Sequence, residues 1–298
     1  MNKSILQDIT VVIRSSNERT IQSCLGLVKR QIPENQVFEV NERPFSKAVK
    51  KTFEIGIREG KKWTLAIDAD ILVKDHAISE MISSFSKLDN SYYVYQGYIF
   101  DKFYQKFRRG GPHLYRTSLL KKAINLIPKE GTSLRPESAT YLKMKELGYH
   151  YFYDTKWFGL HDFEQYYEDI YRKFFLHAKK HQHQAPSFLE TWKNEILEDK
   201  DVVYALKGLS DGLIFEGITY VDTDFFKKKS AHLIEQLNFV EKSNKIDESV
   251  IASHFKCVEE KFKKYKLAKN KIVDSNNPTR EIHFFDILKK HILTLIKR

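Results

Sequence analysis

The sequence WTLAIDADILV, residues 63–73, places two carboxylates between two short apolar runs. The first run, residues 63–67, has the length and apolar content of a buried strand. Asp68 and Asp70 follow it directly. Two carboxylates held close together repel each other, and a divalent cation relieves that repulsion. The stretch therefore predicts a buried strand with an acidic metal site at its carboxyl end.

Two strand-and-helix units precede this stretch. Strands are predicted at residues 9–14 (ITVVIR) and 37–40 (VFEV), and apolar residues recur at helical spacing over 20–31 and 45–59. Helices between successive strands are typical of crossover connections, which parallel strands require. We therefore expect an α/β fold with a mainly parallel sheet flanked by helices, in which ligands gather at the carboxyl ends of the strands.

The rest of the chain divides into a mixed part and a helical part. Apolar spacing and turn residues predict helices at 75–88, 117–126 and 137–147, a strand at 92–100, a basic, turn-rich loop at 108–112 and an edge strand at 149–153. From about residue 163 the pattern becomes helical and highly charged. We expect a catalytic domain over 1–162 and a mostly helical extension over 163–298 that serves the acceptor or a membrane.

Composition narrows the setting of the protein. Among 298 residues only two are cysteines, Cys24 and Cys257, so we expect reduced thiols in a reducing compartment. The first residues, MNKSILQDITVVIR, have no apolar run long enough for a signal peptide, and no run of about 18 apolar residues occurs in the sequence, so we expect neither a signal peptide nor a membrane span. Lys and Arg exceed Asp and Glu by 50 to 39, which favours anionic ligands. We expect a cytoplasmic protein, with residues 280–298 as a candidate contact with the inner face of the cell membrane.

The order of these motifs resembles a known family. ITVVIRSSNE, a helix ending near Gln31, a second strand, a second helix and then WTLAIDADILV resemble the nucleotide-binding half of the GT-A glycosyltransferases, especially the bacterial family 2-like group, over about residues 8–162. The resemblance implies metal-dependent transfer of a sugar from a nucleoside diphosphate, with UDP as the first expectation, to a glycan or lipid-linked acceptor. It implies Mn²⁺ or Mg²⁺ as the cation, and bacterial O-antigen, capsule or lipopolysaccharide synthesis as the setting.

The same resemblance assigns roles to individual residues. It makes Asp68 a metal ligand on the side of the nucleotide ribose, Asp70 a direct metal ligand, and His161 the histidine that completes the metal shell. It places Arg14, Ser15 and Glu18 on the loop that binds the nucleotide, Gly110 to His113 on the acceptor side, and Glu137 as the catalytic base. Asn41-Glu42 stands where the family usually has an acidic pair, which leaves the nucleobase open.

The assignments of Asp70, Glu137 and His161 have simpler structural alternatives. Asp70 or Asp75 would also serve as a helix N-cap, and Glu137 would interact favourably with a helix dipole without acting as a base. His161 would also fit a hydrogen-bonded imidazole at a helix start. Whether the reaction inverts or retains the sugar configuration stays open, since a retaining enzyme does not need a base at Glu137.

Two other function classes fit parts of the pattern. A nucleotidylyltransferase also combines a parallel sheet with acidic metal ligands, but its usual glycine-rich loop is missing from Arg14-Ser15-Ser16-Asn17. A non-catalytic nucleic-acid-binding protein is suggested only by the net charge of +11, and no RNA-binding motif or zinc-ligand spacing supports it. The apolar and lysine-bearing pattern of residues 282–296 fits a membrane-surface helix, and equally a helix packed on the protein.

Overall fold

The computed structural model describes residues 3–130, 132–133, 135–193, 195, 198–217 and 223–274. Contacts within the chain divide it into two units, Met1–Ile251 and Ala252–Arg298, and the sheet and its helices belong to the first. The expected terminal helix at 282–296, and with it the expected membrane contact through 280–298, lies outside the described residues.

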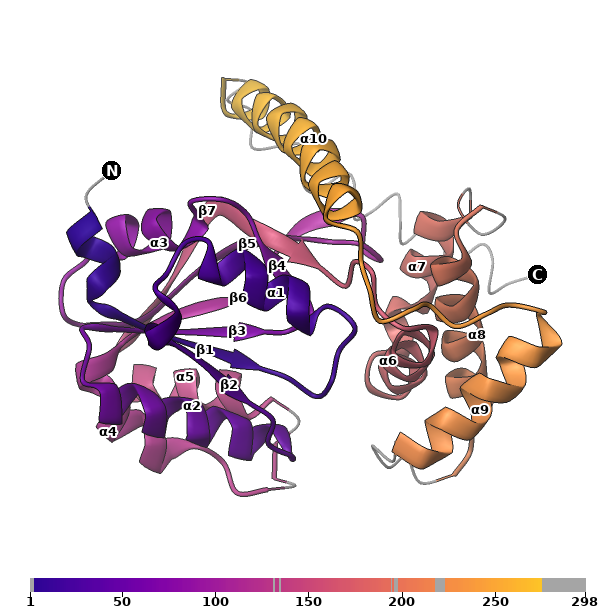
Figure 1. The fold of residues 1–298 in the computed structure, drawn as a ribbon, viewed down its shortest axis with the longest axis horizontal. Helices are drawn as coiled ribbons and strands as arrows, with labels where there is room; N and C mark the ends of the chain where they lie inside the picture. Colours follow the sequence, from indigo (N-terminus) through magenta and orange to yellow (C-terminus); the bar gives the residue numbers. More distant parts are fainter. Residues whose placement is uncertain are drawn as a thin grey trace. The chain divides into compact units, whose positions relative to one another are not determined.

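A curled sheet of seven strands runs through the first unit in the order β2-β1-β3-β6-β5-β7-β4 (Figure 1). The strands are β1 (Ile9–Arg14), β2 (Val37–Val40), β3 (Trp63–Asp68), β4 (Ile71–Val73), β5 (Tyr92–Asp101), β6 (Lys106–Arg116) and β7 (His150–His161). β1 pairs in parallel with β2 and β3, and β5 with β7. β6 is antiparallel to β3 and β5, and β4 is antiparallel to β7. The expected α/β class is confirmed, but the sheet is mixed rather than mainly parallel, because only four residues join β5 to β6 and so short a turn requires antiparallel pairing.

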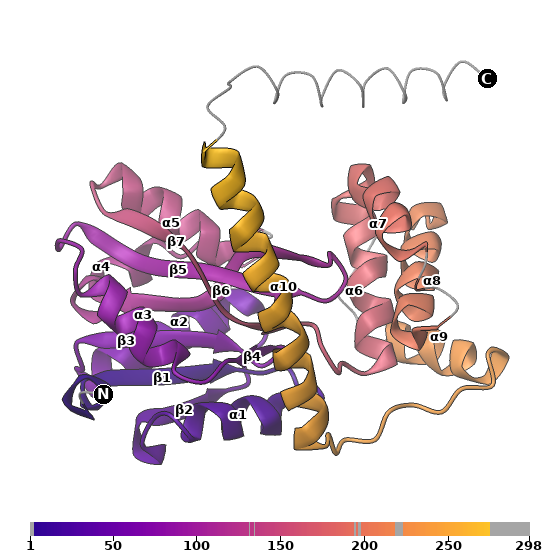
Figure 2. The same cartoon turned by 90° about the horizontal axis from the view of Figure 1, so that it is seen from above.

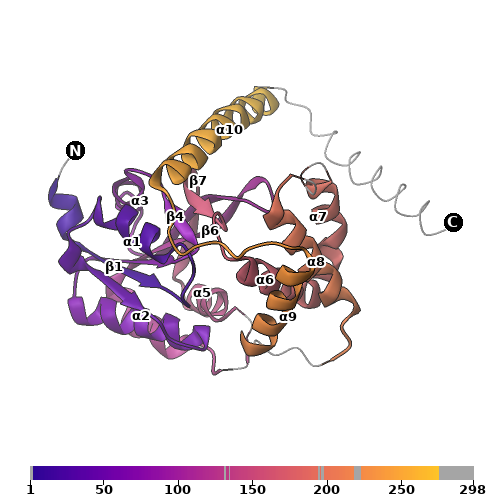
Figure 3. The same ribbon diagram turned by 45° about the vertical axis from the view of Figure 1, so that its right-hand side comes forward.

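Helices cover both faces of the sheet. α1 and α3 lie on one face, and α2 and α5 lie on the other (Figures 1 and 3). Their bounds are α1 Ile21–Lys29, α2 Phe45–Glu59, α3 Ala77–Phe85, α4 Leu120–Ala123 and α5 Pro136–Glu146, with short 3-10 turns η1 Lys3–Gln7, η2 Glu34–Gln36, η3 Thr117–Leu119 and η4 Ile124–Leu126. α2 ends at Gly60, whose φ of 64° is the left-handed conformation that glycine adopts readily at a helix end.

The helical part that follows β7 has its own aromatic core. α6 (Tyr167–Lys180), α7 (Ala185–Trp192), α8 (Lys200–Ile214) and α9 (Thr223–Gln236) gather in one bundle, with η5 (Gln182–Gln184) between α6 and α7 (Figure 2). Gly208 lets α8 approach α6 closely, since a Cβ there would lie 2.3 Å from the Tyr171 carbonyl oxygen. The Trp192 indole donates a 2.9 Å hydrogen bond to the Phe103 carbonyl between β5 and β6. The helical character expected from residue 163 is confirmed, and a domain boundary at residue 162 stays a proposal.

One expected local structure differs from that observed. Residues 108–112, expected as a loop, lie inside β6. The edge strand expected at 149–153 is confirmed as the start of the twelve-residue β7, because residues 150–153 pair with β5 alone and β4 pairs only with residues 159–161. Gly110 and Gly111 suggested a turn, but glycine is needed at residue 110 because the neighbouring strand packs closely there. A Cβ on Gly110 would lie 2.8 Å from the Ile99 side chain of β5. Tertiary contact therefore explains these glycines, which local sequence alone could not show.

One long helix, α10 (Glu248–Asp274), follows the bundle. The Lys/Glu-rich composition of residues 241–275 favours either a solvated helix or a loose linker, and residues 248–274 form the helix. Among the helices of the described residues, none is both long enough and apolar enough to span a bilayer.

Candidate metal centre and adjoining pocket

The end of β3 is fixed by the end of β1. The two strands are in parallel register with Arg14 opposite Asp68, and the Arg14 Nε atom donates a 2.8 Å hydrogen bond to Asp68 Oδ1. The Ala69 amide donates to the Arg14 carbonyl at 2.8 Å, and the Thr20 hydroxyl donates to the Ala69 carbonyl at 2.7 Å. The Asp68-Ala69-Asp70 backbone is therefore held from both sides, so that Asp70 is directed away from the Arg14 pair.

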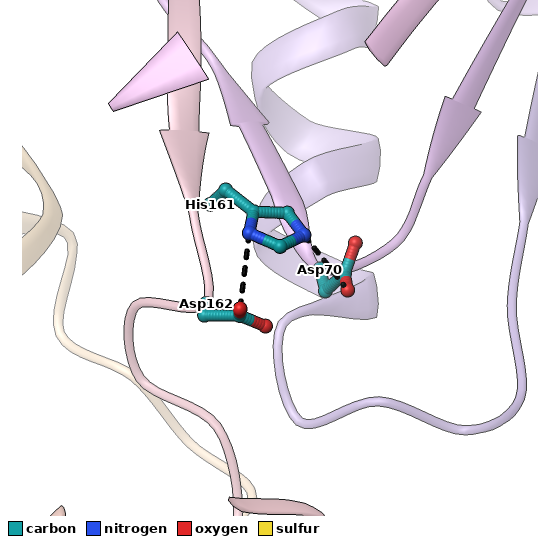
Figure 4. A group of neighbouring side chains, drawn as sticks. All are labelled: Asp70, His161 and Asp162. Atoms are coloured by element: carbon teal, nitrogen blue, oxygen red, sulfur yellow. Dashed lines mark ion pairs between the residues drawn. The ribbon is translucent and has the colours of Figure 1, made fainter. Parts of the chain in front are cut away.

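A second strand pair brings His161 to Asp70. β4 begins directly after Asp70, and its antiparallel register places Ile71 opposite His161, the last residue of β7. The His161 Nε2 atom lies 3.4 Å from Asp70 Oδ2, and Nδ1 lies 3.0 Å from Asp162 Oδ2 (Figure 4). One ligand atom from each of these three residues falls within 4.8 Å of the others. The structure thus unites Asp70 with His161 as the resemblance implies, and it adds Asp162.

The donor set of this cluster fits a divalent cation. Two carboxylates and an imidazole suit Mn²⁺, while Mg²⁺ favours the oxygen ligands. Asp70 Oδ1 is buried and has no hydrogen-bond partner among the described residues. An unpaired buried carboxylate oxygen is costly, and coordination to a cation would satisfy it. The backbone geometry is also specialised, because Asp162 has a φ of 64° and its amide donates to the Asp70 carbonyl at 3.1 Å.

Asp101, at the end of β5, holds the other side of the His161 ring. Its Oδ2 atom lies 2.8 Å from His161 Nδ1 and accepts a 2.7 Å hydrogen bond from Arg108 Nε, while its Oδ1 accepts from the Phe103 amide at 3.0 Å. A carboxylate at the far nitrogen is the usual partner of a metal-bound histidine, because it orients the ring and fixes the position of the proton. With Nδ1 held by Asp101, Nε2 is the nitrogen that faces Asp70.

Cations balance the carboxylates of this cluster. The Lys173 ammonium pairs with Asp162, and it lies 4.0 Å from Asp70 Oδ2. Burial disfavours the charged form of His161, but the Asp162 and Asp70 carboxylates outweigh it and raise the pKa to about 10. The pKa of Asp70 is lowered because His161 and Lys173 outweigh the effect of its own burial. In this state protons and ammonium groups supply the positive charge that a bound cation would otherwise supply.

Glu137 forms a second buried group with Arg14. It lies in the first turn of α5, and its Oε1 accepts a 2.8 Å hydrogen bond from Arg14 Nη1 and another from the Tyr115 hydroxyl. The His113 Nδ1 atom lies 3.4 Å from Glu137 Oε2. Burial would raise the pKa of Glu137, but Arg14 and His113 lower it to about 2. The residue that the resemblance names as the base is therefore an ionised carboxylate held by an arginine.

One pocket adjoins both groups. Its volume is about 260 Å³. The charged and imidazole side chains that line it are Asp68, Arg108, His113, Arg135, Glu137 and His161. A ligand in this pocket would therefore meet His161 of the candidate cation site on one wall and the Glu137 group on another.

The expected nucleotide loop is ordered by its own side chains. The Glu18 carboxylate accepts hydrogen bonds from the Ser16 amide at 2.6 Å and from the Ser15 hydroxyl at 3.1 Å. Asn17 has a φ of 70°, and its side-chain oxygen accepts from Asn41 at 2.9 Å. Arg14 is 3% exposed and is engaged with Asp68 and Glu137. The roles of Arg14, Ser15 and Glu18 in nucleotide binding stay predictions.

The sequence did not single out several residues of the site, among them Asp101, Asp162 and Lys173. Asp101 ends a strand that the sequence predicts, so its position at a strand end was a usable signal. Asp162 directly follows His161 in the chain, but only the β4–β7 register brings it to Asp70. Nothing local marks Lys173, which lies on α6 among other charged residues.

Comparisons with known proteins give weak matches. No family model matches the sequence, and no curated protein matches it. A mannosyltransferase from Pyrobaculum calidifontis, solved with GDP-Man and Mn²⁺, is 12% identical over 76% of this chain and 80% of that chain, with a TM-score of 0.38. A glycosyltransferase involved in the glycosylation of the major capsid of PBCV-1 is 13% identical over 49% of this chain and 82% of its own, with a TM-score of 0.38. The 4-diphosphocytidyl-2C-methyl-D-erythritol synthase of Anaerococcus prevotii is 8% identical over 52% of this chain and 89% of its own, also with a TM-score of 0.38. Since these TM-scores lie below 0.5, the assignment of the site rests on its own geometry.

Proposed function

We propose that this protein is a metal-dependent glycosyltransferase that moves a sugar from a nucleoside-diphosphate donor to a hydroxyl acceptor. One observation carries the proposal: Asp70, His161 and Asp162 converge at the ends of β3 and β7, and the Asp70 Oδ1 atom is buried without a partner among the described residues. The adjoining pocket supplies space for a ligand. Carboxylates at strand ends beside a pocket favour a cation that itself binds a diphosphate.

In this proposal each part of the site has a separate task. Asp70, His161 and Asp162 hold Mn²⁺ or Mg²⁺, and the bound cation supplies positive charge to the departing diphosphate. Asp68 lines the pocket from the Arg14 side, where it binds the donor near the ribose. Burial, together with Asp70 and Glu137, outweighs Arg14 and raises the pKa of Asp68 to about 6, so the neutral acid is favoured more than in an ordinary aspartate.

The finer parts of the proposal rest on the sequence. Arg14, Ser15 and Glu18 form the nucleotide loop, and a UDP-sugar is the first donor to test. The acceptor is a glycan or a lipid-linked glycan in bacterial surface polysaccharide synthesis, in the cytoplasm at the inner face of the membrane. The overall charge of +11 suits both a diphosphate donor and an anionic membrane surface.

A donor screen by thermal shift tests the proposal. The protein is heated with UDP-, GDP-, CMP- and dTDP-sugars, each with and without Mn²⁺. We expect one donor to raise the melting temperature only when Mn²⁺ is present, because a ligand that binds the folded state stabilises it. Release of pyrophosphate from a nucleoside triphosphate and a sugar phosphate would instead indicate a nucleotidylyltransferase.

Asp70→Asn and Asp75→Asn form a matched pair for the same assay. Asp75 is exposed and lies five residues beyond Asp70, so its substitution reproduces the chemical change outside the cluster. Asp70→Asn should lose the Mn²⁺-dependent shift and Asp75→Asn should keep it. A Mn²⁺-dependent shift of wild-type size in Asp70→Asn would contradict the proposal.

A further inference from the structure

His113 occupies an unusual position on β6. Its side chain is 12% exposed and lines the pocket that Asp68 and His161 also line. The Nδ1 atom is buried and has no hydrogen-bond partner in the described part of the chain, although Glu137 Oε2 lies 3.4 Å away. A histidine that only fills space normally has its buried nitrogen satisfied. With Nδ1 turned to Glu137, Nε2 is the nitrogen available to a ligand in the pocket.

Glu137 is well placed to orient this ring and poorly placed to accept a proton itself. Arg14 donates to both of its oxygens, at 2.8 Å and 3.4 Å, and the Tyr115 hydroxyl donates to Oε1. These bonds stabilise the ionised form, so the carboxylate is a weak base. They also hold it in one orientation, which is what a residue that positions a histidine requires.

The surroundings of His113 keep the imidazole neutral. Burial lowers its pKa to about 4, because it disfavours the imidazolium more than the Glu137 carboxylate favours it, and Arg14 opposes the charge as well. Two aromatic rings lie beside the imidazole, with the Tyr141 ring centroid 5.9 Å and the Tyr115 centroid 6.3 Å from that of His113. At neutral pH the ring therefore carries a lone pair that can accept a proton, and its pKa lies above that of Glu137, about 2, so His113 is the stronger base of the two.

We infer that His113 is the general base of the transfer reaction and that Glu137 is its positioning residue. This inference rests on the proposed glycosyltransferase function. It revises the role that the sequence suggested for Glu137, since that carboxylate would act through the imidazole rather than on the acceptor. The Nδ1 proton of His113 would face Glu137 Oε2, leaving the lone pair on Nε2 directed to the acceptor.

The proposed sugar transfer is a single displacement at the anomeric carbon. The acceptor hydroxyl gives its proton to His113 Nε2 while its oxygen forms a bond to the anomeric carbon of the sugar. The bond between that carbon and the diphosphate oxygen breaks, and its electron pair leaves with the nucleoside diphosphate. Glu137 stabilises the imidazolium as it forms. Because attack and departure occur on opposite faces of the carbon, the product has inverted configuration.

Hydrolysis of the donor selected by the thermal screen tests this inference, with water taking the place of the acceptor. The variants are His113→Gln, His113→Ala and the control His150→Gln, whose histidine is exposed at the start of β7. We expect His113→Gln to lower kcat about 10²-fold or more, the range typical of a lost general base, with KM for the donor within about two-fold of wild type. Imidazole added to His113→Ala should restore part of the rate, and His150→Gln should match wild type.

The outcomes separate the two proposals. A wild-type protein that binds no nucleotide sugar with Mn²⁺ would overturn the glycosyltransferase function and this inference together. Wild-type turnover with an unchanged kcat in His113→Gln would overturn this inference alone. Loss of donor and Mn²⁺ binding in both His113 variants would assign the residue to the fold and also overturn it.

Discussion

Asp101→Asn is the substitution whose effect the structure defines most closely. Oδ1 of Asp101 accepts the backbone amides of Phe103 and Tyr104, and an asparagine oxygen can keep both bonds. Oδ2 accepts from Arg108 Nε at 2.7 Å and faces His161 Nδ1 at 2.8 Å. An asparagine NH₂ group at that position would face two other donors, so both charge-assisted bonds would be lost.

The expected cost follows from these two bonds. A hydrogen bond to a charged group contributes about 1.5–3 kcal/mol, which gives an upper range of about 3–6 kcal/mol for the pair. Arg108 is 32% exposed, and His161 keeps Asp162 at 3.0 Å, so both cations retain other stabilisation. We therefore expect a loss of about 3 kcal/mol in the free energy of unfolding. For a folded unit of this size that loss lowers the melting temperature by about 6–12 °C.

Asp101→Asn should also weaken cation binding, which a merely structural residue would leave unchanged. Loss of the partner of a metal-bound histidine typically costs about 10–100-fold in affinity. The assay is titration of Mn²⁺ followed by electron paramagnetic resonance, with thermal unfolding of the same samples. Asp89→Asn is the control, since Asp89 is exposed and bonds the Ser91 amide at 2.8 Å. A Mn²⁺ affinity in folded Asp101→Asn equal to that of Asp89→Asn would refute the reasoning.

Two further predictions concern packing and pH. Gly97→Ala should lower the free energy of unfolding by about 3 kcal/mol in urea titrations, because its Cβ would lie 2.3 Å from the Phe158 ring and 2.6 Å from the Lys156 carbonyl oxygen. In α1, Gly26→Ala places no atom within 4 Å of the new Cβ, so this substitution should raise the free energy of unfolding by about 0.5–1 kcal/mol. Equal changes in the free energy of unfolding for Gly97→Ala and Gly26→Ala would contradict the close packing at Gly97. The pKa of His113 in the folded protein, about 4, lies below the ordinary value of 6.5, so protonation favours the unfolded chain. Relative to His113→Gln, wild type should therefore lose about 3 kcal/mol of stability as the pH falls from 6.5 to 4, and parallel stability curves for the two proteins would refute this.

Local sequence patterns were sufficient to predict the helices and strands of the first part of the chain. β1, β3, α1 and α2 form where apolar periodicity and end signals predict them, as in the Gly60 cap of α2. The same pattern placed Asp68 and Asp70 at the end of a buried strand. These features depend on residues close together in the chain, so a single sequence contains them.

The rest of the site depends on strand register. Asp70 meets His161 only because β4 pairs with β7, and β4 is a three-residue strand that the sequence did not distinguish from a connection. His113 directly follows the loop that was expected at 108–112, and it is part of a pocket wall because β6 continues through Gly110 and Gly111. Pairings between distant segments are set by tertiary packing, which no local pattern shows.

The claim that Asp70, His161 and Asp162 form a cation site is tested most directly by X-ray diffraction. Crystals of the protein grown with Mn²⁺ would be measured at a wavelength where manganese scatters anomalously. We expect an anomalous peak within about 2.0–2.3 Å of Asp70 Oδ1 or Oδ2 and of His161 Nε2, with Asp101 still bonded to Nδ1. A well-ordered crystal with saturating Mn²⁺ and no peak between Asp70 and His161 would contradict it.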